Sequence, residues 1–183
     1  MSYSLRIDDT EIPGVPGMTQ YDLQLQYESA PCGYFYAAVI DLKAGGKALL
    51  EGLPTYDSGM ALAMSKVLTR NGTYRSDWAK LARIAEGPLV YMWNMYVDPS
   101  HRGQGLGFQM LDTAIVKTQQ ARGLVVAELT QYNQRGQHAG KVGKKLIKYG
   151  AAAGFQRKGS YMYLDPTAGR PGASAFLERY RKS

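Results

Sequence analysis

An apolar segment that runs directly into a glycine-rich loop constrains this chain more than any other feature. Residues 89–97 (LVYMWNMYV) are rich in aromatic and β-branched side chains, which favour a buried strand. Pro99 follows shortly afterwards, and the strand should end before it because proline cannot donate to a sheet ladder. A segment with apolar residues at helical spacing comes next, from about residue 104 to 121. The pattern therefore predicts a strand, a tight loop and a helix in succession.

The loop carries glycines at three alternate positions, Gly103, Gly105 and Gly107. Glycine lets a backbone bend closely around a ligand, and the first turn of the next helix presents N–H groups and a positive dipole end, which favour a pyrophosphate. The dinucleotide fingerprint G-x-G-x-x-G does not fit, because Met110 stands where its third glycine would be, and no Gly-Lys-Ser/Thr marks a Walker A loop. The loop predicts a phosphate cradle of another kind, with a purely structural turn as the alternative.

Length and cysteine content limit the class of protein. A chain of 183 residues is long enough for one domain that buries about 70% of the surface exposed when unfolded. The single cysteine, Cys32, provides no disulfide framework, so we expect a reducing, cytoplasmic location. Neither a signal peptide pattern nor an apolar run of the ~18 residues that span a bilayer is found, so we expect no membrane association. The two histidines lack acidic partners at ligand spacing, so we expect no metal site.

The chain is basic, with 22 lysines and arginines against 15 acidic residues and a formal net charge of +7. An anionic cofactor drawn in by this field is one explanation, and an acidic partner such as nucleic acid is another. Surface solvation is a third. Lysines 141, 144, 145 and 148 would lie on one side of a basic helix expected over residues 137–153. Net charge does not choose among these explanations.

The remaining pattern predicts an α/β fold in one domain. Residues 20–27 and 34–42 read as a strand hairpin that ends at Ala44-Gly45-Gly46. The other expected elements are two helices, from Asp57 or Ser58 to about 71 and from Ser76 to about 87, strands at 124–130 and 160–164, and a short C-terminal helix at about 173–181.

The sequence Arg102-x-x-Gly105-x-Gly107 resembles the Arg/Gln-x-x-Gly-x-Gly/Ala acetyl-CoA motif of the GNAT superfamily of N-acetyltransferases. This resemblance implies a mixed, mostly antiparallel central sheet flanked by helices, with acetyl-CoA as co-substrate. It also implies that the backbone of Met95, Tyr96 and Val97 pairs with the pantetheine arm. The implied pyrophosphate contacts are Arg102 and the consecutive backbone amides of Gly103, Gln104, Gly105, Leu106, Gly107 and Phe108.

The resemblance covers residues 89–164 well and the first 88 residues poorly. The Gly/Pro-rich stretch 13–17 separates a short leader (1–17) from the rest of the single domain, 1–183. The rest is expected to comprise substrate-side elements (18–88), an acetyl-CoA-binding core (89–164) and a C-terminal tail (165–183). The common order in the superfamily places two helices between the first and second strands, whereas here a hairpin is expected before both helices. Because these early elements build the acceptor groove, the resemblance does not identify the acceptor.

Glu128 interrupts the apolar strand expected at 124–130, where it shares a face with Val126 and Thr130. An unpaired buried carboxylate is costly, and burial of a carboxyl group raises its pKa toward the range of a general base. A solvent-facing glutamate at a sheet edge is the alternative. Asn133 follows five residues later, a spacing similar to that of the protein N-terminal amine acetyltransferases. In those enzymes the glutamate acts as base and the asparagine contacts the pantetheine region.

Residues 146–155 (LIKYGAAAGF) resemble the superfamily's helix ending L-Y-x-x-x-G-F, in which the tyrosine protonates the departing CoA thiolate. Tyr149 lies six residues before Phe155 rather than about five, and one extra residue rotates a helical side chain by about 100°. Tyr149 is therefore either the catalytic acid or a tyrosine that packs in the core or against pantetheine.

The leading hypothesis is transfer of an acetyl group from acetyl-CoA to a primary amine of a protein, peptide or small molecule, by direct attack in a ternary complex. One alternative is a non-catalytic CoA-binding regulatory module. Another is a nucleic-acid-directed protein, for example one that acts on charged transfer RNA. The acceptor stays open, because the following tyrosines could line an acceptor pocket or fill the core, where we expect most of them: Tyr21, Tyr34, Tyr36, Tyr56 and Tyr91. The oligomeric state stays open too, because the tail 165–183 could dock on its own domain or on a neighbouring chain.

Overall fold

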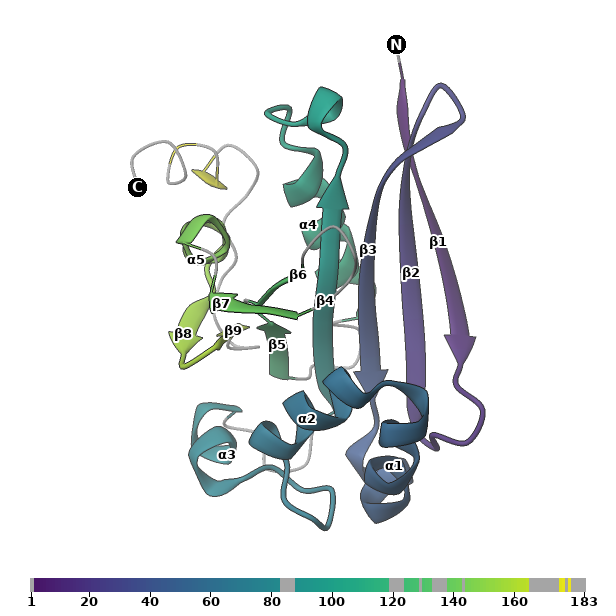
Figure 1. Cartoon of the computed structure of the whole chain (residues 1–183), viewed down its shortest axis with the longest axis vertical. Helices are drawn as coiled ribbons and strands as arrows, with labels where there is room; N and C mark the ends of the chain where they lie inside the picture. The colour runs from purple at the N-terminus through teal and green to yellow at the C-terminus, as the bar shows by residue number, and fades with distance from the viewer. Residues whose placement is uncertain are drawn as a thin grey trace.

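The computed structural model of the chain describes residues 2–82, 88–118, 124–128, 130–132, 138–142, 144–164, 175–176 and 178 (Figure 1). Its strands are β1 (Tyr3–Glu11), β2 (Met18–Tyr27), β3 (Ala30–Ile40), β4 (Leu89–Val97), β5 (Leu124–Glu128), β6 (Thr130–Tyr132), β7 (His138–Val142), β8 (Gln156–Lys158) and β9 (Tyr161–Leu164). Its helices are α1 (Leu42–Tyr56), α2 (Ser58–Val67), α3 (Ser76–Ala82), the 3₁₀ turn η1 (Pro99–His101), α4 (Leu106–Thr118) and α5 (Lys144–Ala152).

Seven of these strands form one sheet in the order β1-β2-β3-β4-β5-β9-β8, and β6 pairs separately with β7. Within the large sheet only the β4–β5 pair is parallel. The β2–β3 hairpin turns at Glu28 and Ser29, which have positive φ angles of 48° and 71° as tight hairpin turns require. The expectation of a mixed, mostly antiparallel sheet flanked by helices is confirmed.

Helices cover both faces of the sheet and bury one apolar cluster on each. Leu111 and Ile115 of α4, Ala152 of α5 and Phe176 of the tail pack on the first face. The second face is covered by α1, α2 and α3, with Leu49 and Met64 among the fully buried side chains. In Figure 1, α1 and α2 lie at the end where β4 begins, whereas β4 runs upward to η1 at the other end. This arrangement places the glycine-rich loop far from the helix pair.

Residues 3–11 form β1, an edge strand that pairs with β2 from Tyr3↔Tyr27 to Glu11↔Thr19, although the sequence analysis assigns residues 1–17 to a leader. Tyr3, Leu5 and Ile7 alternate with exposed residues and pack against the first apolar cluster. Charged side chains at the other positions suit an edge strand, which is protected from pairing with other chains in this way. The alternation is too short and too polar to distinguish this strand from a leader.

Residues 42–56 form α1, where the sequence predicts the end of a strand and a glycine turn. The strand ends at Ile40, and the Asp41 side chain caps the helix by accepting hydrogen bonds from the backbone N–H groups of Lys43 and Ala44. Gly46 has φ 48° and ψ −132°, which divides the element into two helical pieces. The glycine therefore makes a kink inside the element instead of ending it.

The basic helix expected over residues 137–153 is also corrected. Residues His138–Val142 form β7, which pairs with β6, and only Lys144–Ala152 form a helix, α5. Lys141 therefore lies on a strand and does not share a helical face with Lys144 and Lys148. Gly140 lies within β7, and glycine there disfavours a helix.

Other predicted elements are found within a few residues of the expected limits. The Asp57 side chain caps α2 through the N–H of Met60, at 2.8 Å, and α3 begins at Ser76 as predicted. The strand expected at 124–130 ends as β5 at Glu128, and a second strand, β6, begins at Thr130. In the tail, Ala175, Phe176 and Glu178 are helical, and Phe176 packs on this domain with a ring centroid 4.0 Å from that of Phe108.

Candidate active site

The parallel pairing of β4 with β5 stops in the middle of β4. The ladder ends at Met92 and Ala127, whereas β4 continues to Val97 and is paired there with β3 alone among the described strands. Asn94, at φ 51°, is the extra residue of a bulge in this second half of β4. Met95, Tyr96 and Val97 lie in this segment, so part of their backbone is available to an extended ligand.

The glycine-rich loop follows β4 directly and is fixed by Arg102. Arg102 Nε donates a hydrogen bond of 2.7 Å to the Val97 carbonyl, and its guanidinium carbon lies 5.6 Å from the centroid of the Tyr96 ring. Gly103 and Gly105 have φ angles of 81° and 79°, which L side chains rarely adopt, and a Cβ added at either would meet no atom within 4 Å. Both glycines are thus required by backbone conformation, and they border open space.

The first turn of α4 directs its N–H groups toward that space. Gln109 N–H donates to the Gly105 carbonyl, at 3.1 Å, so Gly105 is the N-cap residue. The N–H groups of the next three residues, Leu106, Gly107 and Phe108, therefore have no acceptor within the helix. Such N–H groups, with the positive end of the helix dipole, favour the binding of phosphate groups.

The first strand braces this loop, a contact that sequence reasoning missed. The Tyr3 hydroxyl lies 3.0 Å from His101 Nδ1 and donates a hydrogen bond of 3.1 Å to Gln104 Oε1. The Tyr27 ring centroid lies 5.0 Å from that of Tyr3 and 5.0 Å from that of His101. The Gln104 side chain is thus engaged with Tyr3, which leaves its backbone amide as the group available to a ligand. The alternation of Tyr3, Leu5 and Ile7 is the one signal that could have revealed the brace.

Glu128 lies one residue beyond the point where β4 and β5 separate. It is half-buried, and the Tyr91 hydroxyl donates a hydrogen bond of 2.6 Å to its Oε2 atom. Val126 packs in the cluster beneath α1–α3, and its partner on β9 is Tyr163, so Glu128 belongs to the same face. The shared face of Val126 and Glu128 is as predicted, whereas the Thr130 side chain lies outside the described residues.

A second phenol lies beside this carboxylate. Tyr161 of β9 is the cross-strand partner of Glu128. Burial raises the pKa of Tyr161 to about 12, and the negative charge of Glu128 contributes to this rise. Tyr161 therefore stays protonated at neutral pH, and the Glu128 carboxylate lies beside two tyrosines, Tyr91 and Tyr161.

Tyr149 approaches the glycine loop from α5, on the opposite face of the sheet. Its buried hydroxyl lies 3.1 Å from the position that a Cβ on Gly107 would occupy, and the Sδ and Cε atoms of Met95 lie 3.8 Å from that position. The structure thus brings together a tyrosine of α5, a glycine of α4 and a methionine of β4. Asn133, which the resemblance predicts to contact the pantetheine region, lies outside the described residues.

Four aromatic side chains and Tyr91 follow one another along the α1–α3 face. The ring centroids are 5.4 Å apart for Tyr96 and Tyr34, 5.4 Å for Tyr34 and Tyr36, 6.0 Å for Tyr36 and Trp93, and 5.5 Å for Trp93 and Tyr91. Tyr96 and Tyr34 are exposed, whereas Tyr91 is buried and bonded to Glu128. The series leads from the surface near Arg102 to the carboxylate. The sequence leaves Tyr34, Tyr36 and Tyr91 open between an acceptor pocket and the core, and the resemblance implies a backbone contact for Tyr96.

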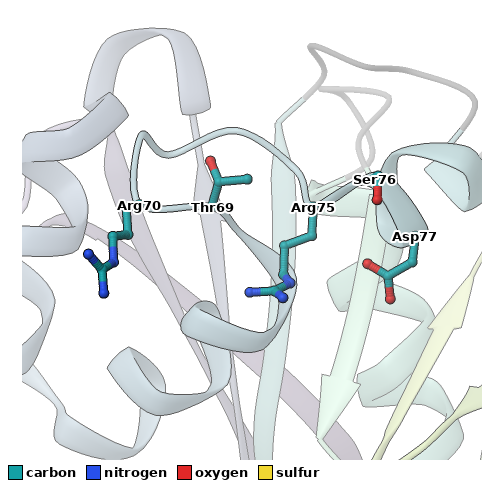
Figure 2. A pocket seen from close by; sticks show the side chains of 5 residues that line it. All are labelled: Thr69, Arg70, Arg75, Ser76 and Asp77. Carbon is teal, nitrogen blue, oxygen red and sulfur yellow. The ribbon is translucent and has the colours of Figure 1, made fainter.

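A separate pocket of about 650 Å³ lies between the end of α2 and the start of α3 (Figure 2). Its lining side chains are those of Thr69, Arg70, Arg75, Ser76 and Asp77. Asp77 is also bound by Lys158 Nζ, at 3.0 Å, and the hydrogen bond from Lys158 lowers the pKa of Asp77. Because α3 lies at the other end of the molecule from η1 (Figure 1), this pocket is distinct from the glycine-loop site.

Two further expectations concern metals and membranes. Among the residues that the structure describes, no group of three or more histidine, cysteine, aspartate or glutamate side chains is placed to hold a metal ion. No helix in the described part of the chain has the length and apolar character needed to cross a membrane.

Among solved structures, the chain is similar to mosquito arylalkylamine N-acetyltransferase like 5b, with 12% identity, a TM-score of 0.48 and coverage of 74% of this chain and 57% of that chain. It is also similar to the loading GNATL domain of CurA from Lyngbya majuscula (16% identity, TM-score 0.34, 91% and 61% covered). A third similar structure is that of Arabidopsis thaliana NAA60 in complex with a bisubstrate analogue, with 14% identity, a TM-score of 0.37 and coverage of 80% of this chain and 72% of that chain.

The chain thus spans less than two thirds of the length of the first two of these structures. None of the curated proteins compared with the chain matches it. The sequence profile of the acetyltransferase (GNAT) family matches residues 8–139, which is more than half of the chain and includes β4, the glycine loop, α4 and Glu128. The chain belongs to the acetyltransferase (GNAT) family.

Proposed function

We propose that this protein transfers an acetyl group from acetyl-CoA to a primary amine, by direct attack of the amine in a ternary complex. One observation carries the proposal: the β4–β5 ladder ends one residue before Glu128, and the second half of β4, which has no β5 partner, leads from there to the N–H groups of α4. A thioester arm lying along β4 would join these two places. The carboxylate would then be beside the reacting carbon and the phosphates would be at the helix terminus.

The residues present fit acetyl-CoA as co-substrate. The amides from Gly103 to Phe108 and the Arg102 guanidinium supply the donors that a pyrophosphate requires. The backbone of Met95, Tyr96 and Val97 supplies the strand edge for the pantetheine arm, and Asn133 is proposed as a further contact to it. Bound acetyl-CoA supplies the activated acetyl thioester.

Proton transfer is assigned to Glu128 and Tyr149. As the amine nitrogen forms its bond to the acetyl carbon, Glu128 accepts the proton that the nitrogen loses. The Tyr91 hydrogen bond holds the carboxylate in position for this step. When the carbon–sulfur bond breaks, the Tyr149 hydroxyl donates a proton to the sulfur. Glu128 thus takes the proton from the amine on the α1–α3 face of the sheet, and Tyr149 supplies the proton to the sulfur from the α4–α5 face.

The first test is calorimetric titration with acetyl-CoA of the wild type and of a Gly105→Glu, Gly107→Glu double variant. The proposal expects binding by the wild type and loss of binding in the variant, because two carboxylates in the cradle repel the phosphates. A folded wild type that does not bind acetyl-CoA contradicts the proposal.

Acetyl transfer is then measured on a panel of primary amines, with Glu128→Gln as the matched isosteric variant. We expect transfer by the wild type and a fall in kcat of about a hundredfold or more in Glu128→Gln, which is the usual contribution of a general base. Tight acetyl-CoA binding without transfer to any amine would instead support the non-catalytic CoA-binding alternative.

A further inference from the structure

Two carboxylates and two aromatic rings lie in one row across the sheet. The register pairs Asp22 of β2 with Tyr36 of β3, and Tyr36 with Trp93 of β4. Glu128 continues the row on β5, because the preceding residue of β5 is paired with the residue that precedes Trp93. Residues directly opposite in neighbouring strands point to the same face. We call these four residues, Asp22, Tyr36, Trp93 and Glu128, the cross-sheet row.

The two ends of the row are both acidic, and its centre is aromatic. Asp22 and Glu128 are three strand intervals apart, which corresponds to about 14 Å between their backbones. Between them the Tyr36 and Trp93 rings lie with centroids 6.0 Å apart; Tyr36 is half-buried, whereas Trp93 is buried. The row thus combines hydrocarbon contact area with an anionic group at each end.

Asp22 has no ion-pair partner among the side chains that the structure describes. Its Oδ1 atom accepts a hydrogen bond of 2.5 Å from Gln20 Nε2. The effect of its charge is seen in its neighbours: burial raises the pKa of Tyr36 and of Tyr56, and Asp22 is the second cause in each. In a chain of net charge +7, this half-buried carboxylate is a negative group without an ion-pair partner among the described residues, on the same face of the sheet as Glu128.

The neighbouring strand offers a direct contrast. Asp8 of β1 is the register partner of Asp22 and lies on the same face, but it is exposed and forms an ion pair of 2.9 Å with Arg6. The charge of Asp8 is therefore compensated within the protein, whereas that of Asp22 is available to a ligand.

We propose that the acceptor is an aliphatic diamine or longer polyamine, which reacts at Glu128 with one amine and binds Asp22 through a second ammonium group. This inference rests on the function proposed above. The hydrocarbon segment between the two nitrogens lies along the half-buried Tyr36 ring, whose face also attracts cations, and passes the buried Trp93 to reach Glu128. An acceptor with a single amine would leave Asp22 without a partner, and an acidic acceptor would be repelled from both ends of the row.

The test is steady-state kinetics with saturating acetyl-CoA on α,ω-diaminoalkanes from butane to dodecane, each compared with the monoamine of equal chain length. We expect kcat/KM to be about tenfold or more higher for the best diamine than for its monoamine, because one additional charged contact is made. The advantage should peak at one chain length, since the distance between the two carboxylates is fixed by the sheet.

Asp22→Asn removes the charge with little change in shape. It should raise KM for the best diamine about tenfold, with kcat and the monoamine kinetics unchanged. Asp8→Asn is the matched control and should change neither KM. Glu128→Gln should lower kcat for both substrate types, which separates the reacting end of the row from the binding end.

The outcomes distinguish this inference from the function on which it rests. Equal kcat/KM for diamines and monoamines, or an unchanged diamine KM in a folded Asp22→Asn, overturns the diamine assignment and leaves the acetyltransferase function in place. If Asp22→Asn does not fold, the chain-length comparison on the wild type still decides. Acetyl-CoA binding without transfer to any amine overturns both.

Discussion

Tyr91 and Glu128 are joined by a hydrogen bond of 2.6 Å across the junction where β4 and β5 separate. Tyr91 is buried beneath α1–α3 and its ring stacks on Trp93, with centroids 5.5 Å apart. The phenol is therefore held by packing, and it limits the positions that the carboxylate can take. The proposed base is thus oriented by a residue that does not reach solvent.

Tyr91→Phe should lower kcat about tenfold, because a hydrogen bond to a charged group contributes about 1.5–3 kcal/mol and the freed carboxylate spends less time in the reactive position. KM for acetyl-CoA should stay unchanged, since the ring and its packing remain. Steady-state kinetics measure both. Tyr74→Phe is the control, because that buried hydroxyl donates to the Pro88 carbonyl; it should affect stability and not kcat. An unchanged kcat in Tyr91→Phe would show that the hydrogen bond does not orient the base.

Tyr149→Phe separates the two interpretations of Tyr149. If the hydroxyl protonates the leaving sulfur, kcat falls about a hundredfold and the affinity for CoA is unchanged. We expect this result, measured by steady-state kinetics together with calorimetric titration of CoA. Weaker CoA binding at an unchanged kcat would instead identify Tyr149 as a residue that packs against pantetheine.

Gly107→Ala tests the contact between α4 and α5. The new methyl group would lie 3.1 Å from the Tyr149 hydroxyl, so this side chain must move by a few tenths of an ångström. We expect weaker acetyl-CoA binding and a lower kcat. In a Tyr149→Phe background the same substitution should weaken binding less, because the crowding oxygen is gone. Additive effects in this double-mutant cycle would mean that the two positions do not interact.

Gly72→Ala should destabilise the fold by about 2 kcal/mol or more, through backbone strain and a steric clash. Gly72 has φ 76°, and its Cβ would lie 2.4 Å from the Gly46 carbonyl oxygen, at the kink of α1. Gly159→Ala is the matched control, since Gly159 has φ 63° but open space around its Cβ, and it should cost only about 1 kcal/mol. Urea unfolding measures both. Equal losses in the free energy of unfolding for the two variants would show that the packing of the Gly72 turn against α1 contributes nothing to stability.

Tyr161 should make stability depend on alkaline pH. Burial, followed by the charge of Glu128, raises its pKa from 10.0 to about 12 in the folded protein. The folded state therefore holds this proton more tightly than the unfolded chain. The contribution to the free energy of unfolding is fully present below pH 10 and is lost as the pH rises to about 12. Urea unfolding of Tyr161→Phe across this range should show a shallower decline than the wild type, and parallel declines would contradict the assignment.

The central part of the fold could be predicted because its signals are local. The apolar run of β4, the proline after it and the periodic apolar residues of α4 each determine their own element, and the glycine loop lies between them. The motif Arg102-x-x-Gly105-x-Gly107 therefore predicted which residues form the loop. The mostly antiparallel sheet came from the family resemblance, because strand order is a property of distant pairings.

The missed elements have identifiable physical causes. In α1, Gly45, Gly46 and Pro54 disfavour a helix, and the element exists because Asp41 caps it and because Leu49 and Leu53 are buried beneath it. Tertiary packing here outweighs intrinsic propensity. In β7, pairing with β6 outweighs a helical pattern, and no local residue reveals that pairing.

The site was predicted in part. The positions of Glu128 and Tyr149 in their elements were found, but the partners of these residues were not: Tyr91 meets Glu128 from a strand 37 residues away in sequence. Such contacts depend on strand register, and the bulge at Asn94 changes the register within β4. A reading based on strict alternation would place Trp93 and Tyr96 on opposite faces, although both lie on the face of the aromatic series.

The first strand has a practical consequence for anyone who expresses this domain. A clone cut to the limits of the family match, residues 8–139, would omit Tyr3 at one end and Tyr149 at the other. The first of these residues supports His101 and Gln104, and the second lies against Gly107. Because a cut at residue 139 also removes α5, β8 and β9, an inactive product of such a clone would report the loss of these elements together with the two tyrosines, and it would give no information about the chemistry of the intact chain.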